Sequence, residues 1–252
     1  MSLTNNFNDK RLRAAVPLYI QIAESLLDRI TSGELAPEER LQSERDLSQS
    51  LNVSRMTLRA ALRVLDNKGM LVRRPGDGTY IAKPKIERQA AKLVSFTDGM
   101  RSRGYQASAQ LIVFERKLAE VSIASKLQVP VSAPVYYFQR LRLINQEPVL
   151  LETCTIPIYR FPNLEEYDLE KRSIIEIMET EYGIAPHHSE QSLEAVSATD
   201  YEAELLNIEA GTPLMLERRL AFDKDDSPLE HGHDLYRGDR FRFITEIAPL
   251  QP

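Results

Sequence analysis

Two short helices joined by a tight turn and followed by a glycine-containing hairpin are predicted between residues 43 and 81. Ser43 and Ser54 each precede a helical pattern, and a serine hydroxyl there accepts a hydrogen bond from the unpaired amides of a first turn. The three residues 51–53 between the helices are too few to let their crossing angle vary. The segment is therefore predicted to be a helix-turn-helix with a β-wing, a layout typical of proteins that bind duplex DNA.

The residues before this motif supply its hydrophobic support. Pro17 to Ile30 carries apolar residues four apart, which predicts one buried stripe on a helix that ends by Gly33. The helix that begins after Ser54 is predicted to run to about Lys68. Residues 1–85 contain 14 basic and 10 acidic side chains, whereas the remainder contains 18 and 27. This asymmetry favours a basic DNA-binding part joined to an acidic part with another role.

Polar side chains at the start of the second helix of the motif are the candidate DNA contacts. Arg55 and Arg59 share a helix face, and an arginine at this place pairs bidentately with guanine in the major groove. Serine and threonine hydroxyls there donate to phosphates. An isolated helical arginine usually belongs to a solvated face, but caps, spacing, apolar stripe and wing all agree here. The predicted DNA-binding residues are Arg45, Ser54, Arg55, Thr57, Arg59 and Gly76.

Composition excludes several classes of protein. The 252 residues contain no apolar run near the roughly 18 needed to cross a bilayer, and the N-terminus has no signal-peptide core. We therefore expect a cytoplasmic protein with no membrane contact. A single cysteine, Cys154, rules out an intramolecular disulfide and is expected to be a buried structural thiol.

The rest of the chain favours an α+β fold with an antiparallel sheet. Residues 82–94 are charged and alanine-rich, as in a connector. Runs of mostly adjacent strands with a few helices follow, a pattern typical of such sheets. The predicted strands are 135–144, 148–156, 190–197, 213–222, 228–235 and 241–247, and the predicted helices are 119–127, 172–182 and 199–206.

Charged residues on these predicted strands suggest a pocket. Arg140 and Arg142 are two apart, so both leave the same sheet face, where they repel unless an anion or carboxylates lie between them. Glu230, Asp234 and Tyr236 likewise share a face, and Glu152 is a lone carboxylate in an apolar strand. Thr97 and Ser173 stand where helices begin. One interpretation is a pocket with a cationic and a carboxylate end, and the other is simple pairing of Arg140 and Arg142 with Glu152 and Glu230 on an exposed face.

Signs of catalysis or cofactor binding are missing from the sequence. His231 and His233 are two apart on one strand, but no third metal ligand stands at a recognisable spacing. There is no nucleophile elbow, phosphate-binding loop or dinucleotide fingerprint. We therefore expect no catalytic residues, no metal and no cofactor.

The segment from Pro17 to Ile81 resembles the N-terminal domain of GntR-type transcriptional regulators. The matching motifs are P-L-Y-x-Q-I, R-L-x-S-E-R-x-L, V-S-R-x-T-L-R-x-A-L and R-R-x-G-x-G-T-Y. The resemblance implies a winged helix that binds a palindromic operator as a homodimer, with Arg45, Arg55 and Arg59 as main contacts. Glu39 and Gln42 depart from the usual Gly and Pro.

The later segments resemble the UTRA effector domain of the HutC-type branch of this family. These are S-F-T-D-G-M-R-S-R-G from Ser95, R-L-R from Arg140, P-V-L-L-E from Pro148 and Y-R-G-D-R-F from Tyr236. The resemblance implies a chorismate-lyase-like fold that senses a small molecule. It also implies three parts: a DNA-binding domain at 1–82, a linker at 83–94 and an effector-binding and dimerisation domain at 95–252.

The same resemblance implies the effector-binding residues. In members that bind amino-sugar phosphates, the positions of Thr97, Arg140, Arg142 and Ser173 hold the phosphate, and those of Glu152, Glu230 and Tyr236 face the sugar. Ile175 stands where a Tyr is often found, which removes one phosphate donor. We therefore expect a repressor released by a sugar phosphate or amino-sugar phosphate. The alternatives are a small carboxylate effector, or a second domain that only dimerises.

Overall fold

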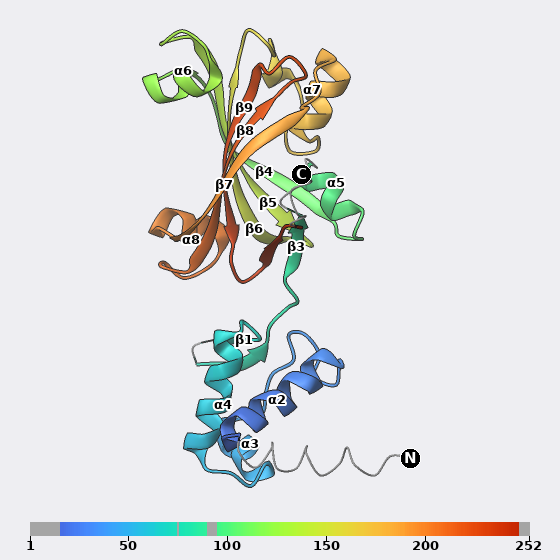
Figure 1. Cartoon of the computed structure of the whole chain (residues 1–252), viewed down its shortest axis with the longest axis vertical. Helices are drawn as coiled ribbons and strands as arrows, with labels where there is room; N and C mark the ends of the chain where they lie inside the picture. The colour runs from blue at the N-terminus through green and yellow to red at the C-terminus, as the bar shows by residue number, and fades with distance from the viewer. Residues whose placement is uncertain (1–15, 75, 90–94, 247–252) are drawn as a thin grey trace, which may run out of the picture. The chain divides into compact units, whose positions relative to one another are not determined.

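The computed structural model describes residues 16–74, 76–89 and 95–246. The chain forms two compact units, Met1–Pro84 and Lys85–Pro252 (Figure 1). Each unit has its own hydrophobic core.

The first unit contains the predicted helix-turn-helix. Its helices are α2 (Leu18–Thr31), α3 (Glu44–Ser50) and α4 (Arg55–Asn67). The predicted serine caps are present, since Ser43 Oγ accepts from the amide of Asp46 at 3.2 Å and Ser54 Oγ from that of Thr57 at 3.1 Å. Buried leucines of α2, α3 and α4 meet in one core with Leu71 and Ile81 of the wing. This core fixes the angle at which α4 is presented.

The wing is a two-stranded antiparallel sheet of β1 (Leu71–Arg74) and β2 (Gly78–Ile81). Gly76 in its turn has a φ of +75°, which glycine adopts without steric cost. Tyr80 donates to Asp77 at 2.7 Å, and the Arg74 guanidinium lies 4.1 Å from the Tyr80 ring centre. These contacts tie the turn to its strands.

The turn before α3 differs in detail from the sequence prediction. Glu39 was identified as the departure from a usual glycine, yet the left-handed backbone lies one residue earlier, at Glu38 with a φ of +65°. The Glu39 carboxylate instead accepts from the amide of Ala36 at 2.8 Å. The glycine of the family pattern therefore corresponds in backbone conformation to Glu38.

The second unit is built on a six-stranded antiparallel sheet in the order β4-β5-β6-β9-β8-β7. Its strands are β4 (Ala107–Leu118), β5 (Pro134–Ile144), β6 (Glu147–Pro157), β7 (His188–Ser197), β8 (Pro213–Phe222) and β9 (Pro228–Arg237). Five of these were predicted, with ends shifted by a few residues. The edge strand β4 was not predicted, because its polar residues and its bulge between Leu111 and Val113 break the alternating pattern.

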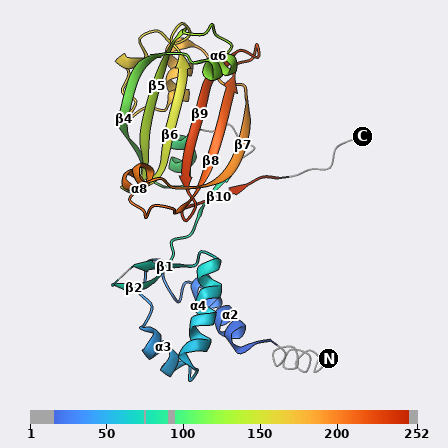
Figure 2. The same ribbon diagram turned by 90° about the vertical axis from the view of Figure 1, so that its left-hand side faces the viewer.

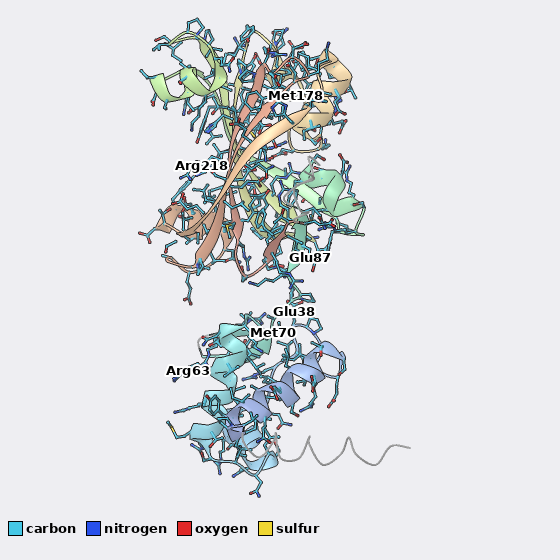
Figure 3. All side chains as sticks on the ribbon, viewed as in Figure 1. Glu38, Arg63, Met70, Glu87, Met178 and Arg218 are labelled. Atoms are coloured by element: carbon cyan, nitrogen blue, oxygen red, sulfur yellow. The ribbon has the colours of Figure 1, made fainter. Side chains whose placement is uncertain are left out.

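Helices cover both faces of this sheet (Figures 1 and 2). On one face lie α5 (Phe96–Arg101) and α7 (Ile174–Tyr182), and on the other α6 (Val121–Leu127) and α8 (Asp200–Leu206). A one-turn 3₁₀ helix, η1 (Leu164–Glu166), precedes α7. Beneath α7, Met178 is fully buried in an apolar cluster with Tyr136 and Phe161 (Figure 3). This cluster anchors α7 against the sheet.

One strand of a second, two-stranded sheet lies within the predicted connector. Here β3 (Ile86–Gln89) pairs in parallel with β10 (Phe241–Ile244). The strand predicted at 241–247 therefore exists in part, and its last residue lies outside the described residues. It joins β3 rather than the large antiparallel sheet. Residues 86–89 are thus part of the second unit.

No helix among the described residues is long and apolar enough to span a membrane.

The first unit should depend on the leucines beneath α4. Leu65 is 1% exposed, so Leu65→Ala should lower the free energy of unfolding by about 2–5 kcal/mol through the cavity it leaves. Urea denaturation of the full-length protein, followed by circular dichroism in the helical region, measures this change. The matched control is Leu51→Ala, since Leu51 is 37% exposed and should cost less than about 1 kcal/mol. Equal losses would contradict the described core.

Candidate functional site

The first candidate site is the exposed N-terminal end of α4 with the neighbouring residues of α3. The side chains of Arg45 and Arg55 are exposed and form no hydrogen bond or ion pair with other described residues. Ser54 and Thr57 share a hydrogen bond of 2.8 Å between their hydroxyls. The structure brings the predicted arginines and hydroxyls together at one end of the helix pair, next to the positive end of the α4 dipole.

Arg59 is held differently from the other two arginines. Its Nε donates to Glu44 of α3 at 2.6 Å, an ion pair that the sequence did not reveal. Because Arg59 is exposed, this pair is worth little in water and a phosphate competes with it. Gly76 lies in the exposed wing turn, separate from the α4 residues.

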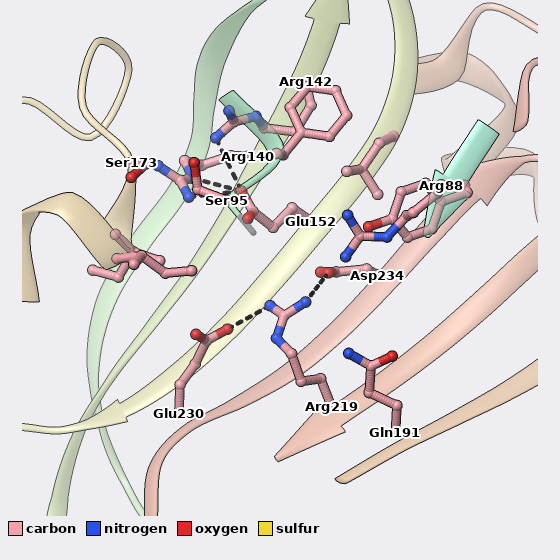
Figure 4. Close-up of a pocket in the computed structure, with 15 residues that line it drawn as sticks. Arg88, Ser95, Arg140, Arg142, Glu152, Ser173, Gln191, Arg219, Glu230 and Asp234 are labelled. Carbon is pink, nitrogen blue, oxygen red and sulfur yellow. Dashed lines mark hydrogen bonds and ion pairs between the residues drawn. The ribbon is translucent and has the colours of Figure 1, made fainter. Parts of the chain in front are cut away.

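The second candidate site is a pocket in the second unit (Figure 4). It lies between the sheet and the first turns of α5 and α7, and its volume of about 520 Å³ includes space that is open to the solvent. Six of the seven predicted effector residues line it, and the seventh, Thr97, bonds to one of them. The six are Arg140, Arg142, Glu152, Ser173, Glu230 and Tyr236.

The exposed-face interpretation of the two arginines is wrong. Arg140 and Arg142 are 1% and 2% exposed. Both do pair with Glu152, whose Oε2 accepts from Arg140 Nε at 2.8 Å and lies 3.4 Å from Nη1 of Arg142. Glu230 pairs instead with an arginine from another strand, Arg219. These buried charges therefore face a pocket.

The two arginines differ in how many of their donors the protein uses. Arg140 also donates to the backbone carbonyls of Leu169 and Arg172, so its guanidinium holds the chain that leads into α7. Arg142 donates to Thr97 Oγ1 at 2.6 Å, while its Nε is buried without a hydrogen-bond partner among the described residues. Arg142 is therefore the arginine with a donor left for a ligand.

The first turn of α7 borders the same end of the pocket. Ser173 caps this helix by accepting from the amide of Glu176 at 3.0 Å, which leaves the serine proton to donate. The amides of Ile174 and Ile175 have no acceptor among the described residues. Two arginines facing one carboxylate, next to a helix N-terminus, make this end electropositive. Thr97 lies in the first turn of α5, whose cap is Ser95.

The opposite end of the pocket carries carboxylates. Arg219 of β8 donates to Glu230 at 2.8 Å and to Asp234 at 3.0 Å, both on β9. Gly232 lies between them, and a Cβ there would stand 2.9 Å from a terminal nitrogen of Arg219. The glycine therefore leaves room for the guanidinium to reach both carboxylates. Tyr236 packs edge-on against Phe241 and Phe243 in the pocket wall.

Several pocket residues were not predicted as effector residues. Asp234 was placed on the correct face by its spacing but was not carried into the predicted set. Arg219 shares a face with Glu217 on β8, a signal hidden because the run Glu217-Arg218-Arg219 places a charge on both faces. Arg88 comes from β3 and ion-pairs with Glu217 at 3.2 Å, so it was hidden in the presumed connector. The other lining residues that were not predicted are Ser95, Phe96, Leu150, Ile174, Ile175 and Gln191.

Burial and pairing shift the pKa values of these groups in opposite directions. Burial raises the pKa of Asp234 to about 7, although Arg219 opposes this shift, and the nearby carboxylates Glu152, Glu217 and Glu230 raise it further. Burial alone would also raise the pKa of Glu152, but Arg140 and Arg142 hold it below its usual value. Burial raises the pKa of the Cys154 thiol, which is fully buried as predicted. The thiol stays protonated and bonds to Glu230 at 3.2 Å.

His231 and His233 lie on the other face of the sheet. Burial lowers the pKa of both imidazoles, that of His231 to about 4, helped by the charge of Lys126. Lys126 Nζ is 3.0 Å from His231 Nε2. Neither histidine lines the pocket.

A winged helix-turn-helix followed by a unit with a charged pocket defines a class of ligand-sensing DNA-binding regulators. Comparison with known proteins agrees with this class. Residues 18–81 match the family described as "Bacterial regulatory proteins, gntR family", and residues 102–242 match the UTRA domain. The chain belongs to the GntR family of transcriptional regulators, in the HutC-type branch that carries a UTRA domain.

Individual relatives are similar over nearly their whole length. The HTH-type transcriptional repressor NagR of Bacillus subtilis is 35% identical, over 94% of this chain and 98% of the relative. The probable fructoselysine utilization operon transcriptional repressor of Escherichia coli K12 is 27% identical, over 91% and 94%. The crystal structure of PhnF from Mycobacterium smegmatis superposes with a TM-score of 0.66 at 31% identity, covering 90% of this chain and 99% of that one.

The raised pKa of Asp234 gives the stability a distinct pH dependence. Its ordinary pKa is 3.8 and the folded pKa is about 7, so the folded state keeps a proton that the unfolded state has lost. This stabilisation is complete below about pH 4 and is lost as the pH rises to about 7. Asp234→Asn removes this titration. The unfolding free energy of the variant minus that of the wild type should therefore increase from about pH 4 to about pH 7 and stay constant above pH 7.

Denaturant unfolding at half-unit pH steps measures this difference. The control is Asp225→Asn, because Asp225 is an exposed aspartate in the turn between β8 and β9. A stability difference between wild type and Asp234→Asn that stays constant from pH 4 to pH 8 would contradict the assignment.

Proposed function

We propose that this regulator is a homodimeric repressor that a small anionic effector releases from its operator. A phosphorylated sugar or amino sugar fits the pocket best. The observation that carries this proposal is the electropositive end, where Arg140 and Arg142 share one carboxylate, Glu152, beside the first turn of α7. An anion is the ligand that such an arrangement stabilises.

The donors left unused at this end support an oxyanion with several acceptor oxygens. They are the Nε of Arg142, the hydroxyl proton of Ser173 and the amides of Ile174 and Ile175. A phosphate has enough acceptors for all of them. Arg140 stands behind these donors as a buried positive charge that also fixes the approach to α7. Thr97 accepts from Arg142 and so orients its guanidinium.

A small carboxylate is the alternative effector. Ile175 lines the pocket with an apolar side chain, so this position offers only its amide to an anion. A carboxylate has fewer acceptor oxygens than a phosphate and needs fewer donors. The two classes therefore differ in how many of the pocket donors they use, which binding measurements resolve.

DNA binding is assigned to the exposed end of α4. Arg55 and Arg45 are free to contact bases and phosphates, Ser54 and Thr57 lie at the helix N-terminus, and Gly76 forms the wing turn. A recognition helix of this kind reads one half-site, so a palindromic operator needs two copies of the chain. Two of the relatives described above carry the name of repressor, NagR and the probable repressor of a fructoselysine utilization operon, and this supports repression as the mode of control.

The connector provides a route from the pocket to the DNA-binding unit. Arg88 lies on β3, only three residues after the second unit begins at Lys85, and its guanidinium borders the pocket beside Glu217 and Tyr236. A ligand that changes these contacts also acts on β3. We infer that effector binding shifts the connector and with it the spacing of the two operator-binding helices, which costs operator affinity.

Removal of Arg55 tests the DNA-binding assignment. Arg55→Ala should weaken binding to an operator selected in vitro by the wild type, roughly tenfold to a hundredfold, since a bidentate base contact is lost. Fluorescence anisotropy at one fixed salt concentration measures the affinity. Arg116→Ala, an equal loss of charge from an exposed residue of the second unit, is the control and should change it little. Equal effects of both substitutions would refute a specific contact.

Thermal melts against a panel of sugar phosphates, small carboxylates and amino acids test the effector class. A ligand at about 100 times its dissociation constant should stabilise the protein by roughly 2.7 kcal/mol. Arg142→Gln should abolish this stabilisation, because it removes the donor that faces the anion. A response to phosphates supports the main proposal, and a response to carboxylates alone supports the alternative. No response to any of them would favour a second unit that only dimerises.

A further inference from the structure

Three acidic side chains on neighbouring strands form a row on the face of the sheet that carries the pocket, and two of them, Glu152 and Asp234, line the pocket. Glu152 on β6 is directly paired with Asp234 on β9, and Asp234 is directly paired with Glu217 on β8. Their exposed fractions are 6%, 2% and 1%, so all three are buried on one face of the sheet. Like charges directly opposite each other on neighbouring strands repel, and burial strengthens the repulsion.

The arginines around this row leave one negative charge without a partner of its own. Arg140 and Arg142 both form ion pairs with Glu152, and Arg88 forms an ion pair with Glu217. Arg219 forms ion pairs with both Glu230 and Asp234, so its single positive charge is shared between them. It also lies 4.0 Å from Glu217. The central member, Asp234, is therefore the carboxylate that is least neutralised. The two ends of the pocket thus carry opposite net charge.

Three carboxylates around the pocket, those of Asp234, Glu230 and Glu152, have unused acceptor atoms (Figure 4). Oδ1 of Asp234 is buried without a hydrogen-bond partner among the described residues. Glu230 accepts from Arg219 and Cys154 through Oε1 alone, and Glu152 accepts through Oε2 alone. Each of these three carboxylates therefore keeps one oxygen that accepts nothing from the described protein. All three residues line the pocket.

We propose that Asp234 is a specificity-determining residue that binds a protonated amine of the effector, with Glu230 and Glu152 as its neighbours. The proposal rests on the proposed function, because it describes the other end of the same ligand. An ammonium group offers three donors and one positive charge, which match the unused oxygens and the surplus negative charge. A hydroxyl or an amide supplies donors but no charge, so it does not reduce the repulsion between Asp234 and the neighbouring carboxylates.

Arg219 and Gly232 hold Asp234 in position for this contact. The guanidinium crosses β9 over the bare backbone of Gly232 and binds one oxygen of Asp234, so the other oxygen is oriented by the protein. This pairing keeps Glu230 and Asp234 at a fixed separation before a ligand arrives. Less ordering is then needed when the amine binds.

In the protein without ligand, a proton on Asp234 neutralises the charge that the amine would otherwise neutralise. The charged or titratable groups around Asp234 are Arg88 from β3, Arg142 from β5, Glu152 and Cys154 from β6, Arg219 and Glu217 from β8, and Glu230 and Tyr236 from β9. Their sum favours a protonated Asp234 near neutral pH and below. An incoming ammonium displaces that proton. The preference for an amine should therefore weaken as the pH falls.

The test compares two ligands that differ only by an amine and a hydroxyl. If phosphates stabilise the protein, the pair is glucosamine 6-phosphate and glucose 6-phosphate, and if carboxylates do, it is alanine and lactate. Titration calorimetry on the full-length protein gives both affinities. At pH 7.5 we expect the amine to bind roughly tenfold to a hundredfold more tightly, as for a buried charge-assisted hydrogen bond. The ratio of the amine's affinity to the hydroxyl's affinity should fall as the pH is lowered to 5.5. Because both ligands carry the same anionic group, its contribution cancels from the ratio.

Asp234→Asn isolates the contribution of this carboxylate. The variant should bring the affinity ratio close to one and remove its pH dependence. Asp225→Asn is the matched control and should keep the wild-type ratio. The wild-type pH series needs no variant, so it tests the proposal even if Asp234→Asn folds poorly.

The possible failures are distinguishable. Equal affinities for the two ligands, or a ratio that Asp234→Asn leaves unchanged, would overturn the amine site while the anion sensor stands. Tighter binding of the neutral N-acetyl analogue, N-acetylglucosamine 6-phosphate, than of the amine would also overturn it. No binding of either pair would contradict the sensor and the amine site together.

Discussion

The structure of the second unit depends on the neutralisation of charges buried on one face of its sheet. Three arginines of the sheet, Arg140, Arg142 and Arg219, lie on this face with four carboxylates, and Arg88 of β3 packs against them. A buried charge without a partner costs several kcal/mol, so each must be paired, protonated or left for a ligand. Pairing at one end leaves positive charge and at the other negative charge. The same constraint that lets the sheet fold therefore creates a polar pocket with two distinct ends.

The fold was predictable wherever local pattern and local chemistry agreed. The first unit follows from its caps and its apolar stripe, because Ser43 and Ser54 act within one turn and α2, α3 and α4 pack on near neighbours. Strands rich in β-forming residues and bounded by turn residues, such as β5, were likewise evident. The edge strand β4 and the parallel pairing of β3 with β10 were not. Both depend on contacts between distant residues that no local pattern records.

The pocket shows the same division between local and distant information. Spacing by two placed Arg140 with Arg142, and Glu230 with Tyr236, on shared faces. Spacing did not show that Arg142 keeps an unpaired Nε, or that Arg140 donates to backbone carbonyls of the loop before α7. Spacing also did not predict that Arg88 of the connector lines the pocket, or that Arg219 reaches two carboxylates past Gly232. The register of the sheet decides which residues line the pocket. The family resemblance indicated pocket residues only where this sequence matches the family's motifs.

The most direct test of this account is operator affinity with and without the ligand that stabilises the protein in melts. Fluorescence anisotropy at fixed salt should show that the ligand weakens operator binding by the wild type and leaves Arg142→Gln bound. That result joins the anion end of the pocket to control of DNA binding. Operator affinity that the ligand does not change in the wild type would contradict the account, and so would an equal response from Arg142→Gln.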